Sequence, residues 1–179
     1  MEYNLVDAAI RFAAERHSGA FLDGPDPLPY ICHPLDVLHL ARTIGEIRDE
    51  PRLVAAVLHD LIEETTTSEV ELIDRFGPEP TRIVSALTRE EPTPVQTANM
   101  SKDQIWSLRS QMLLDEITAM PPDVWPIKLA DRLSNVREAK QTKKGAKRER
   151  YLGQTRAILK IIPLDINPAL WEAIRRELD

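Results

Sequence analysis

The segment 50–65 places four ionisable side chains at the end of an apolar run, in the sequence EPRLVAAVLHDLIEET. The stretch 53–58 is entirely apolar, which predicts a helix buried in a core. Directly after it come His59, Asp60, Glu63 and Glu64. Burying unpaired carboxylates costs several kcal/mol each, as an order of magnitude. The chain is therefore constrained to fold around something that neutralises these acids.

Helical periodicity recurs along the chain, and no stretch alternates apolar and polar residues as a half-buried strand would. Two proline-containing segments, 19–34 and 91–102, are predicted loops, and the second is the better candidate for a mobile one. We therefore expect an all-α fold in which 179 residues form a single domain, 1–179. The expected helices are 3–17, 34–45, 50–65, 66–77, 78–90, 101–120, 124–139, 142–163 and 167–178.

Composition excludes several classes of protein. The net charge of −6 argues against nucleic-acid binding, which requires a basic surface. Cys32 is the one cysteine, so no disulfide forms within the chain. The amphipathic N-terminus does not resemble a signal peptide, and no apolar run approaches the roughly 20 residues that span a membrane. We expect a cytoplasmic protein without a nucleic-acid or membrane partner.

An anionic ligand would need a local positive charge, for which a bound metal is the simplest source.

A metal would also explain the acids of segment 50–65. In a continuous helix, residues four apart share a face, so His59 is expected to stack with Glu63 and Asp60 with Glu64. Imidazole and carboxylate together suit Mn²⁺, Fe²⁺, Zn²⁺ or Mg²⁺ rather than Ca²⁺. Further ligands must come from elsewhere. His33 stands where a predicted helix begins, and Asp131 is an acid within an apolar helical stretch.

Taken singly, each of these residues is more often structural than functional. In order, however, the blocks YICHP, AAVLHDLIEET, FGPEPTRIVSALT and IKLADRLSN resemble those of the HD-domain metal-dependent phosphohydrolases. The resemblance is strongest to the hydrolase domain of RelA/SpoT-type alarmone enzymes and to stand-alone small hydrolases of the MESH1 type. It covers roughly residues 5–160.

The resemblance implies a helical bundle of roughly eight to ten helices around one Mn²⁺ ion, with Fe²⁺, Zn²⁺ or Mg²⁺ as alternatives. It assigns the metal ligands to His33, His59, Asp60 and Asp131. It implies Glu63 and Glu64 as the catalytic acidic pair. The implied reaction removes the 3′-pyrophosphate from ppGpp or pppGpp by attack of a metal-bound hydroxide. The substrate-binding residues expected with it are Asn135, which closes the last block, and the cations Arg89, Lys128, Arg132 and Arg137.

The sequence departs from the family pattern in the loop before His33. The family carries an arginine–lysine pair there, and this chain has Leu22 and Asp23. A second departure is Glu64 where the family usually has aspartate, and a third is Thr88-Arg89 where it often has threonine–lysine. Loss of two cations from the loop favours a substrate other than ppGpp, or a substrate that is held differently.

Three functions therefore remain open. The first is pyrophosphohydrolysis of an alarmone such as (p)ppGpp. The second is an HD phosphohydrolase acting on another phosphorylated nucleotide, ppApp-like or NADPH-like. The third is a catalytically weak metal-binding sensor, which the retained acidic pair disfavours. The sequence leaves the oligomeric state open, a homodimer included.

Overall fold

Helix α3 (Glu50–Leu58) lies at the centre of the molecule, which a computed structural model describes over residues 3–179. Every side chain of α3 from Leu53 to Leu58 is buried, as the apolar run predicts. The helix begins where the Asp49 side chain accepts a hydrogen bond from the Arg52 backbone N–H. Four helices pack against it: α1 (Asn4–Arg16), α2 (Cys32–Thr43), α6 (Pro78–Leu87) and α9 (Trp125–Thr142).

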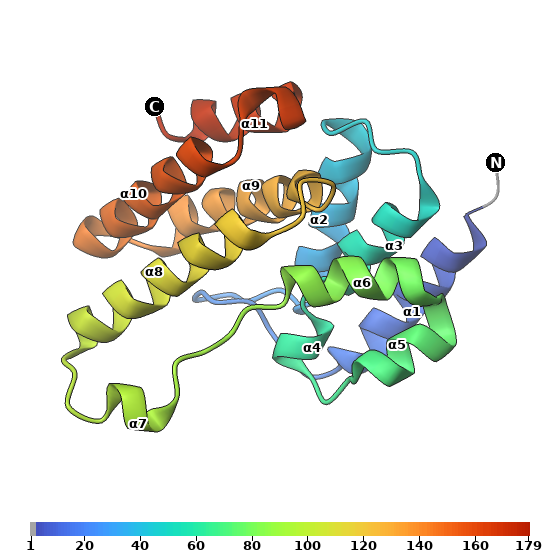
Figure 1. The fold of residues 1–179 in the computed structure, drawn as a ribbon, viewed down its shortest axis with the longest axis horizontal. Coiled ribbons are helices and arrows are strands. Elements are labelled where there is room, and N and C mark those ends of the chain that lie inside the picture. Colours follow the sequence, from blue (N-terminus) through green and yellow to red (C-terminus); the bar gives the residue numbers. More distant parts are fainter. Residues whose placement is uncertain (1–2) are drawn as a thin grey trace.

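Two groups of helices meet along α2. On one side, α1 and α6 pack on α3, and α5 (Glu69–Phe76) packs on α6 (Figure 1). On the other, α9 contacts α10 (Gly145–Ile161) and α11 (Pro168–Glu177), and α8 (Lys102–Ala119) contacts α10. A short 3-10 helix, Leu164–Ile166, precedes α11. Because α2 contacts both α3 and α9, it joins the two groups.

The predicted all-α class is confirmed. Residues 3–179 form eleven α-helices and no strand, and an isolated bridge pairs Phe21 with Pro29. Ser68 caps α5 as its position predicts, since its side chain accepts a hydrogen bond from the Glu71 backbone N–H. Within this described part of the chain, no helix is long and apolar enough to cross a membrane.

The prediction of one continuous helix over 50–65 is wrong. Helix α3 ends at Leu58, and α4 (Leu61–Glu64) starts again after Asp60. Asp60 leaves helical geometry, with φ −112° and ψ 1°, and its carbonyl accepts hydrogen bonds from the backbone N–H groups of Glu63 and Glu64. The expected stacking of His59 on Glu63 and of Asp60 on Glu64 therefore does not apply.

Other segments differ from expectation as well, and α6 ends at Leu87 while α9 continues to Thr142. The predicted loop 91–102 contains a one-turn helix, α7 (Pro94–Thr97), because Thr93 and Gln96 form a capping box. Helix α2 begins at Cys32 rather than at Pro34, since the prolines before it still permit a turn at Ile31. Pro34 is thus the third residue of the helix, where its missing N–H loses no intrahelical hydrogen bond.

Gly45 allows the end of α2 to approach α11 closely. A Cβ atom at this position would lie 2.8 Å from the Ala41 carbonyl oxygen and 2.8 Å from Leu170 Cδ1. The Gly45 carbonyl also accepts a hydrogen bond from Asn167 Nδ2 at 2.9 Å. The junction therefore leaves no space for a side chain.

We predict that Gly45→Ala destabilises the protein by about 1–3 kcal/mol, because backbone and a buried leucine must both move. Gly153→Ala is the matched control. Gly153 lies within α10 with no atom within 4 Å of an added Cβ, so alanine there should stabilise by about 0.5–1 kcal/mol. Urea unfolding of both variants measures the difference, and equal effects would contradict the packing argument.

Candidate active site

The four predicted metal ligands come from three helices that contact one another. His33 lies in the first turn of α2, His59 and Asp60 form the junction between α3 and α4, and Asp131 lies in α9. All four residues are buried. The break at Asp60 matters here, because adjacent residues of a continuous helix project about 100° apart. In the structure, His59 Nε2 and Asp60 Oδ2 lie 3.9 Å apart instead.

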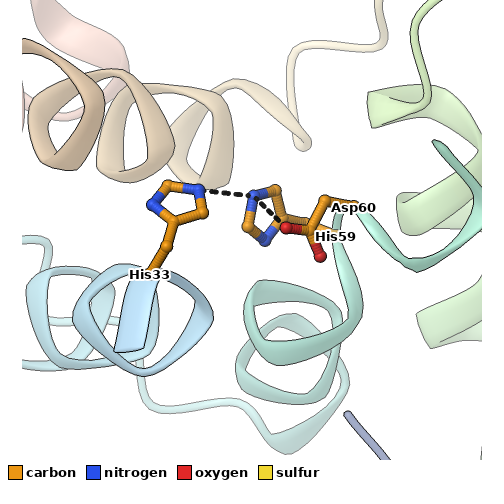
Figure 2. A group of neighbouring side chains, drawn as sticks. All are labelled: His33, His59 and Asp60. Carbon is orange, nitrogen blue, oxygen red and sulfur yellow. Dashed lines mark hydrogen bonds and ion pairs between the residues drawn. The ribbon is translucent and has the colours of Figure 1, made fainter. Parts of the chain in front are cut away.

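The two imidazoles face each other through the same ring atom. His33 Nε2 lies 3.2 Å from His59 Nε2. Figure 2 marks this contact with a dashed line between the two rings. On the far side of each ring, His33 Nδ1 contacts Ser134 Oγ at 3.2 Å and His59 Nδ1 contacts the Ala56 carbonyl oxygen at 3.0 Å. A carbonyl only accepts, so His59 carries its proton on Nδ1 and turns the Nε2 lone pair toward His33.

The two carboxylates flank this pair of nitrogens. Asp131 Oδ1 lies 3.5 Å from His33 Nε2 and 3.7 Å from His59 Nε2. Burial alone would raise the pKa of Asp131, but Lys128 Nζ at 3.1 Å from Oδ2 and the nearby histidines hold it well below its usual range. Burial opposes ionisation of Asp60 too, yet His59 and His17 lower its pKa to about 2. Both acids are therefore negatively charged at neutral pH.

This donor set fits a divalent cation. Ligand atoms of His33, His59 and Asp60 lie within 4.8 Å of one another. Asp60 Oδ2 is buried and has no hydrogen-bond partner among the described residues, a costly arrangement unless it binds something. Two imidazole nitrogens and carboxylate oxygens are ligands that Mn²⁺, Fe²⁺ and Zn²⁺ accept.

A cleft of about 430 Å³ opens over the cluster. Glu63 Oε1 accepts a hydrogen bond of 2.6 Å from the Arg89 backbone N–H, and partial burial raises the pKa of Glu63. Lys128 and Asn135 both donate to Asp131, so they hold a candidate ligand as well as facing the cleft. The four metal-ligand candidates line the cleft, as do Lys128 and Asn135. The other predicted residues in its lining are Glu63, Glu64, Arg89 and Arg132.

Arg137 is the predicted substrate contact that the structure places elsewhere. Lys128, Asp131 and Asn135 are spaced three and four residues apart and share one face of α9. Arg137 follows Asn135 by two residues, about 200° around the axis. It faces α11, where its Nε lies 3.0 Å from Glu177 Oε1. Helical register therefore removes Arg137 from the site.

A sequence model of the HD domain matches residues 9–159, which span the whole site. The chain belongs to the HD domain family. The all-α architecture and the resemblance to RelA/SpoT-type and MESH1-type proteins agree with this result.

Several relatives are about one-third identical to this HD domain. The chain is 31% identical over 137 residues to Xenopus tropicalis MESH1, named a guanosine-3′,5′-bis(diphosphate) 3′-pyrophosphohydrolase, with 76% of this chain and 70% of that one aligned. It is 33% identical over 129 residues to the Danio rerio protein of the same name, with 72% and 66% aligned. An Aquifex aeolicus enzyme with the same activity in its name is 32% identical over 132 residues, but the match spans only 17% of its length.

A solved structure shows the same fold. It is that of a metazoan SpoT orthologue described as hydrolysing ppGpp, and it superimposes with a TM-score of 0.82 at 22% identity, covering 97% of this chain and 93% of that one. The likeness confirms the arrangement of helices.

Some residues of the site in this HD domain carried little signal in the sequence. His17 contacts Asp60 Oδ1 through Nε2 at 3.2 Å. Its ring packs 4.7 Å from that of Tyr30, which also lines the cleft. Trp106 lines the cleft from α8. Of these three residues, only Tyr30 belongs to one of the sequence blocks that resemble the family, YICHP.

The loop that departs from the family pattern does border the cleft. Phe21, Leu22 and Asp23 are all part of its lining. Lys143 and Tyr151 line the cleft as well, and the Tyr151 ring centroid is 5.5 Å from Lys143 Nζ. The change from two cations to Leu22 and Asp23 therefore falls where a ligand would meet it.

We predict that a divalent cation stabilises this HD domain and that the effect depends on His59. With free Mn²⁺ at 100 times its dissociation constant, binding to the folded state alone adds about 2.7 kcal/mol. Thermal unfolding of metal-stripped and reloaded protein measures the shift, with bound metal determined by elemental analysis.

The matched variants for this test are His59→Ala, which should abolish the shift, and His39→Ala, which should retain it. His39 lies on α2 as His33 does, but it is exposed. A full metal-dependent shift in His59→Ala would contradict the assignment of the centre.

Proposed function

We propose that the protein is a metal-dependent nucleotide pyrophosphohydrolase that removes the 3′-pyrophosphate from an alarmone such as ppGpp or pppGpp. The observation that carries the proposal is a buried cluster of two histidines and two aspartates at the base of a cleft that Glu63 and Glu64 also line. The MESH1 relatives, whose names give this activity, support the choice of substrate.

His33, His59, Asp60 and Asp131 would hold the ion, for which we propose Mn²⁺. When bound, a divalent cation acts as a Lewis acid that activates water at neutral pH and offsets phosphoryl charge. Ser134 and the Ala56 carbonyl orient the two imidazoles so that each Nε2 faces the site. His17 holds the Asp60 carboxylate, while Lys128 and Asn135 hold that of Asp131.

Glu63 is our candidate for accepting the proton of the attacking water. Its carboxylate is held at Oε1 by the Arg89 backbone N–H, its side chain is 20% exposed, and its raised pKa makes it a better base than an ordinary glutamate. Glu64 lines the same cleft and would assist in orienting the water. The phosphorus bonded to the ribose 3′ oxygen is the centre attacked. Arg89, Lys128 and Arg132 would balance the charge on its oxygens.

A second substrate class follows from one observation. Asp23 lines the cleft and is an acid where the family carries a cation, so it would repel a polyphosphate. This favours a different phosphorylated nucleotide, ppApp-like or NADPH-like, as the alternative substrate. A metal-binding sensor needs no carboxylate such as Glu63 in the cleft, which disfavours that function.

We further propose that residues 1–179 act as one domain and that the protein works in the cytoplasm. The HD domain match over residues 9–159 and the connected packing of α1–α3, α5, α6 and α8–α11 support a single unit.

We expect metal-reloaded protein to release pyrophosphate from ppGpp, and a turnover screen tests this. The screen offers ppGpp, pppGpp, ppApp, NADPH and ordinary nucleoside phosphates, with His59→Ala and Asp60→Ala as blanks. Turnover of only ppApp or NADPH would select the alternative substrate. Silence on every nucleotide, with metal bound, would refute hydrolysis.

Glu63→Gln should reduce kcat by about 10²–10⁴-fold with the metal still bound, because the amide cannot accept the proton. Glu69→Gln, an exposed residue in the first turn of α5 and outside the cleft, is the control and should not change kcat. An unchanged kcat in Glu63→Gln would show that another group accepts the proton.

The double variant Leu22→Arg with Asp23→Lys should lower the KM for ppGpp, since it returns two cations to the cleft wall. Asp26→Lys with Leu28→Arg makes the same charge change in the same loop at exposed positions that do not line the cleft. A KM that falls equally in both variants would indicate general electrostatic attraction and not a contact at residues 22 and 23.

A further inference from the structure

Two arginines on the α8 side of the cleft share one carboxylate. Arg89 Nη2 lies 2.9 Å from Glu91 Oε1, and Arg109 Nε lies 2.6 Å from Glu91 Oε2. Both arginines line the cleft, whereas Glu91 does not. The carboxylate therefore bridges the guanidinium groups from outside the cleft wall.

The backbone that carries Arg89 and Glu91 is fixed on two sides. The Arg89 N–H donates to Glu63 Oε1 at 2.6 Å, and the Glu90 N–H donates to Glu116 Oε1 of α8 at 3.0 Å. These bonds tie the segment following α6 to both α4 and α8. The relative position of the two arginines is thus set by the fold as well as by Glu91.

Each guanidinium has five N–H donors arranged to match the oxygens of a phosphate. The bridge engages one nitrogen of each arginine, which leaves other donors of both groups for a ligand in the cleft. Glu91 meanwhile cancels one of their two positive charges, and Glu63 Oε2 lies farther from Arg89 Nη2, at 3.9 Å. Since its side chain is 44% exposed, this ion pair adds little to folding stability, and a competing anion meets no tightly buried partner.

We propose that Arg89 and Arg109 form a paired-guanidinium subsite for a phosphate group of the substrate, and that Glu91 sets its affinity by supplying the counter-charge. Arg109 is thereby a substrate-binding residue and Glu91 a specificity-determining one. The identity of the anion as a phosphate rests on the proposed function. The subsite itself rests on the two arginines and their shared carboxylate.

The test measures the binding of inorganic pyrophosphate to the metal-loaded protein by isothermal titration calorimetry. Every variant keeps the four candidate metal ligands, so binding at the metal cancels when variants are compared. Arg109→Gln should weaken binding about tenfold, because a charge-assisted contact is lost. Glu91→Gln should tighten binding about threefold, because the competing charge is removed.

Helix α11 provides the matched controls. Glu172 and Arg175 form an ion pair of 2.8 Å outside the cleft lining, with side chains 37% and 49% exposed, close to the 44% and 55% of Glu91 and Arg109. Glu172→Gln and Arg175→Gln make the same charge changes and should leave pyrophosphate binding unaltered.

Equal binding by Arg109→Gln and Arg175→Gln, or no binding by any form, would overturn the subsite. Unchanged or weaker binding in Glu91→Gln would overturn its role as counter-charge. Failure of the proposed function alone would give a different pair of results. Pyrophosphate binding would still depend on Arg109, but the protein would not turn over ppGpp. If ppGpp is turned over, Glu91→Gln should lower its KM without changing kcat.

Discussion

The packing of α3 against both α2 and α9 is the contact on which the site depends. It brings His33, the His59–Asp60 junction and Asp131 together, although these residues are separated by up to 98 positions in the chain. The apolar run of α3 supplies the free energy for this contact, because its side chains are buried from Leu53 onward. The end of the same helix then supplies two of the four candidate ligands. The segment 50–60 thus contributes both to the core and to the site.

The charge lining the cleft explains how an acidic protein can take an anionic ligand. Five lysine and arginine side chains and six aspartate and glutamate side chains line it, so the wall carries one net negative charge before an ion binds. A divalent cation reverses this to one positive charge. The metal we propose is therefore required for attraction of the nucleotide as well as for chemistry, and the fold leaves little positive charge to replace it.

Much of this arrangement was predictable from the sequence, and each failure has its own physical cause. Periodicity and caps located most helices, and the ordered blocks led to His33, His59, Asp60 and Asp131. Periodicity did not locate the break at Asp60, because Leu61 and Ile62 continue the apolar pattern across it. His17, Trp106 and Arg109 were missed as site residues because their place in the cleft depends on how distant helices pack. Arg137 was misplaced although the register of α9 alone points it away from Asp131.

The break at Asp60 also bears on the change from aspartate to Glu64. If α3 continued through Glu64, its helical register would fix the positions of Glu63 and Glu64. The extra methylene of a glutamate would then carry its carboxylate beyond the place that an aspartate carboxylate reaches. Here α4 is a separate turn whose start is set by the Asp60 carbonyl. Glu63 has its own anchor in the Arg89 N–H, whereas no such bond holds the Glu64 carboxylate among the described residues. A longer side chain at position 64 therefore leaves the anchored base unmoved, and Glu63 is the acid whose geometry the fold controls.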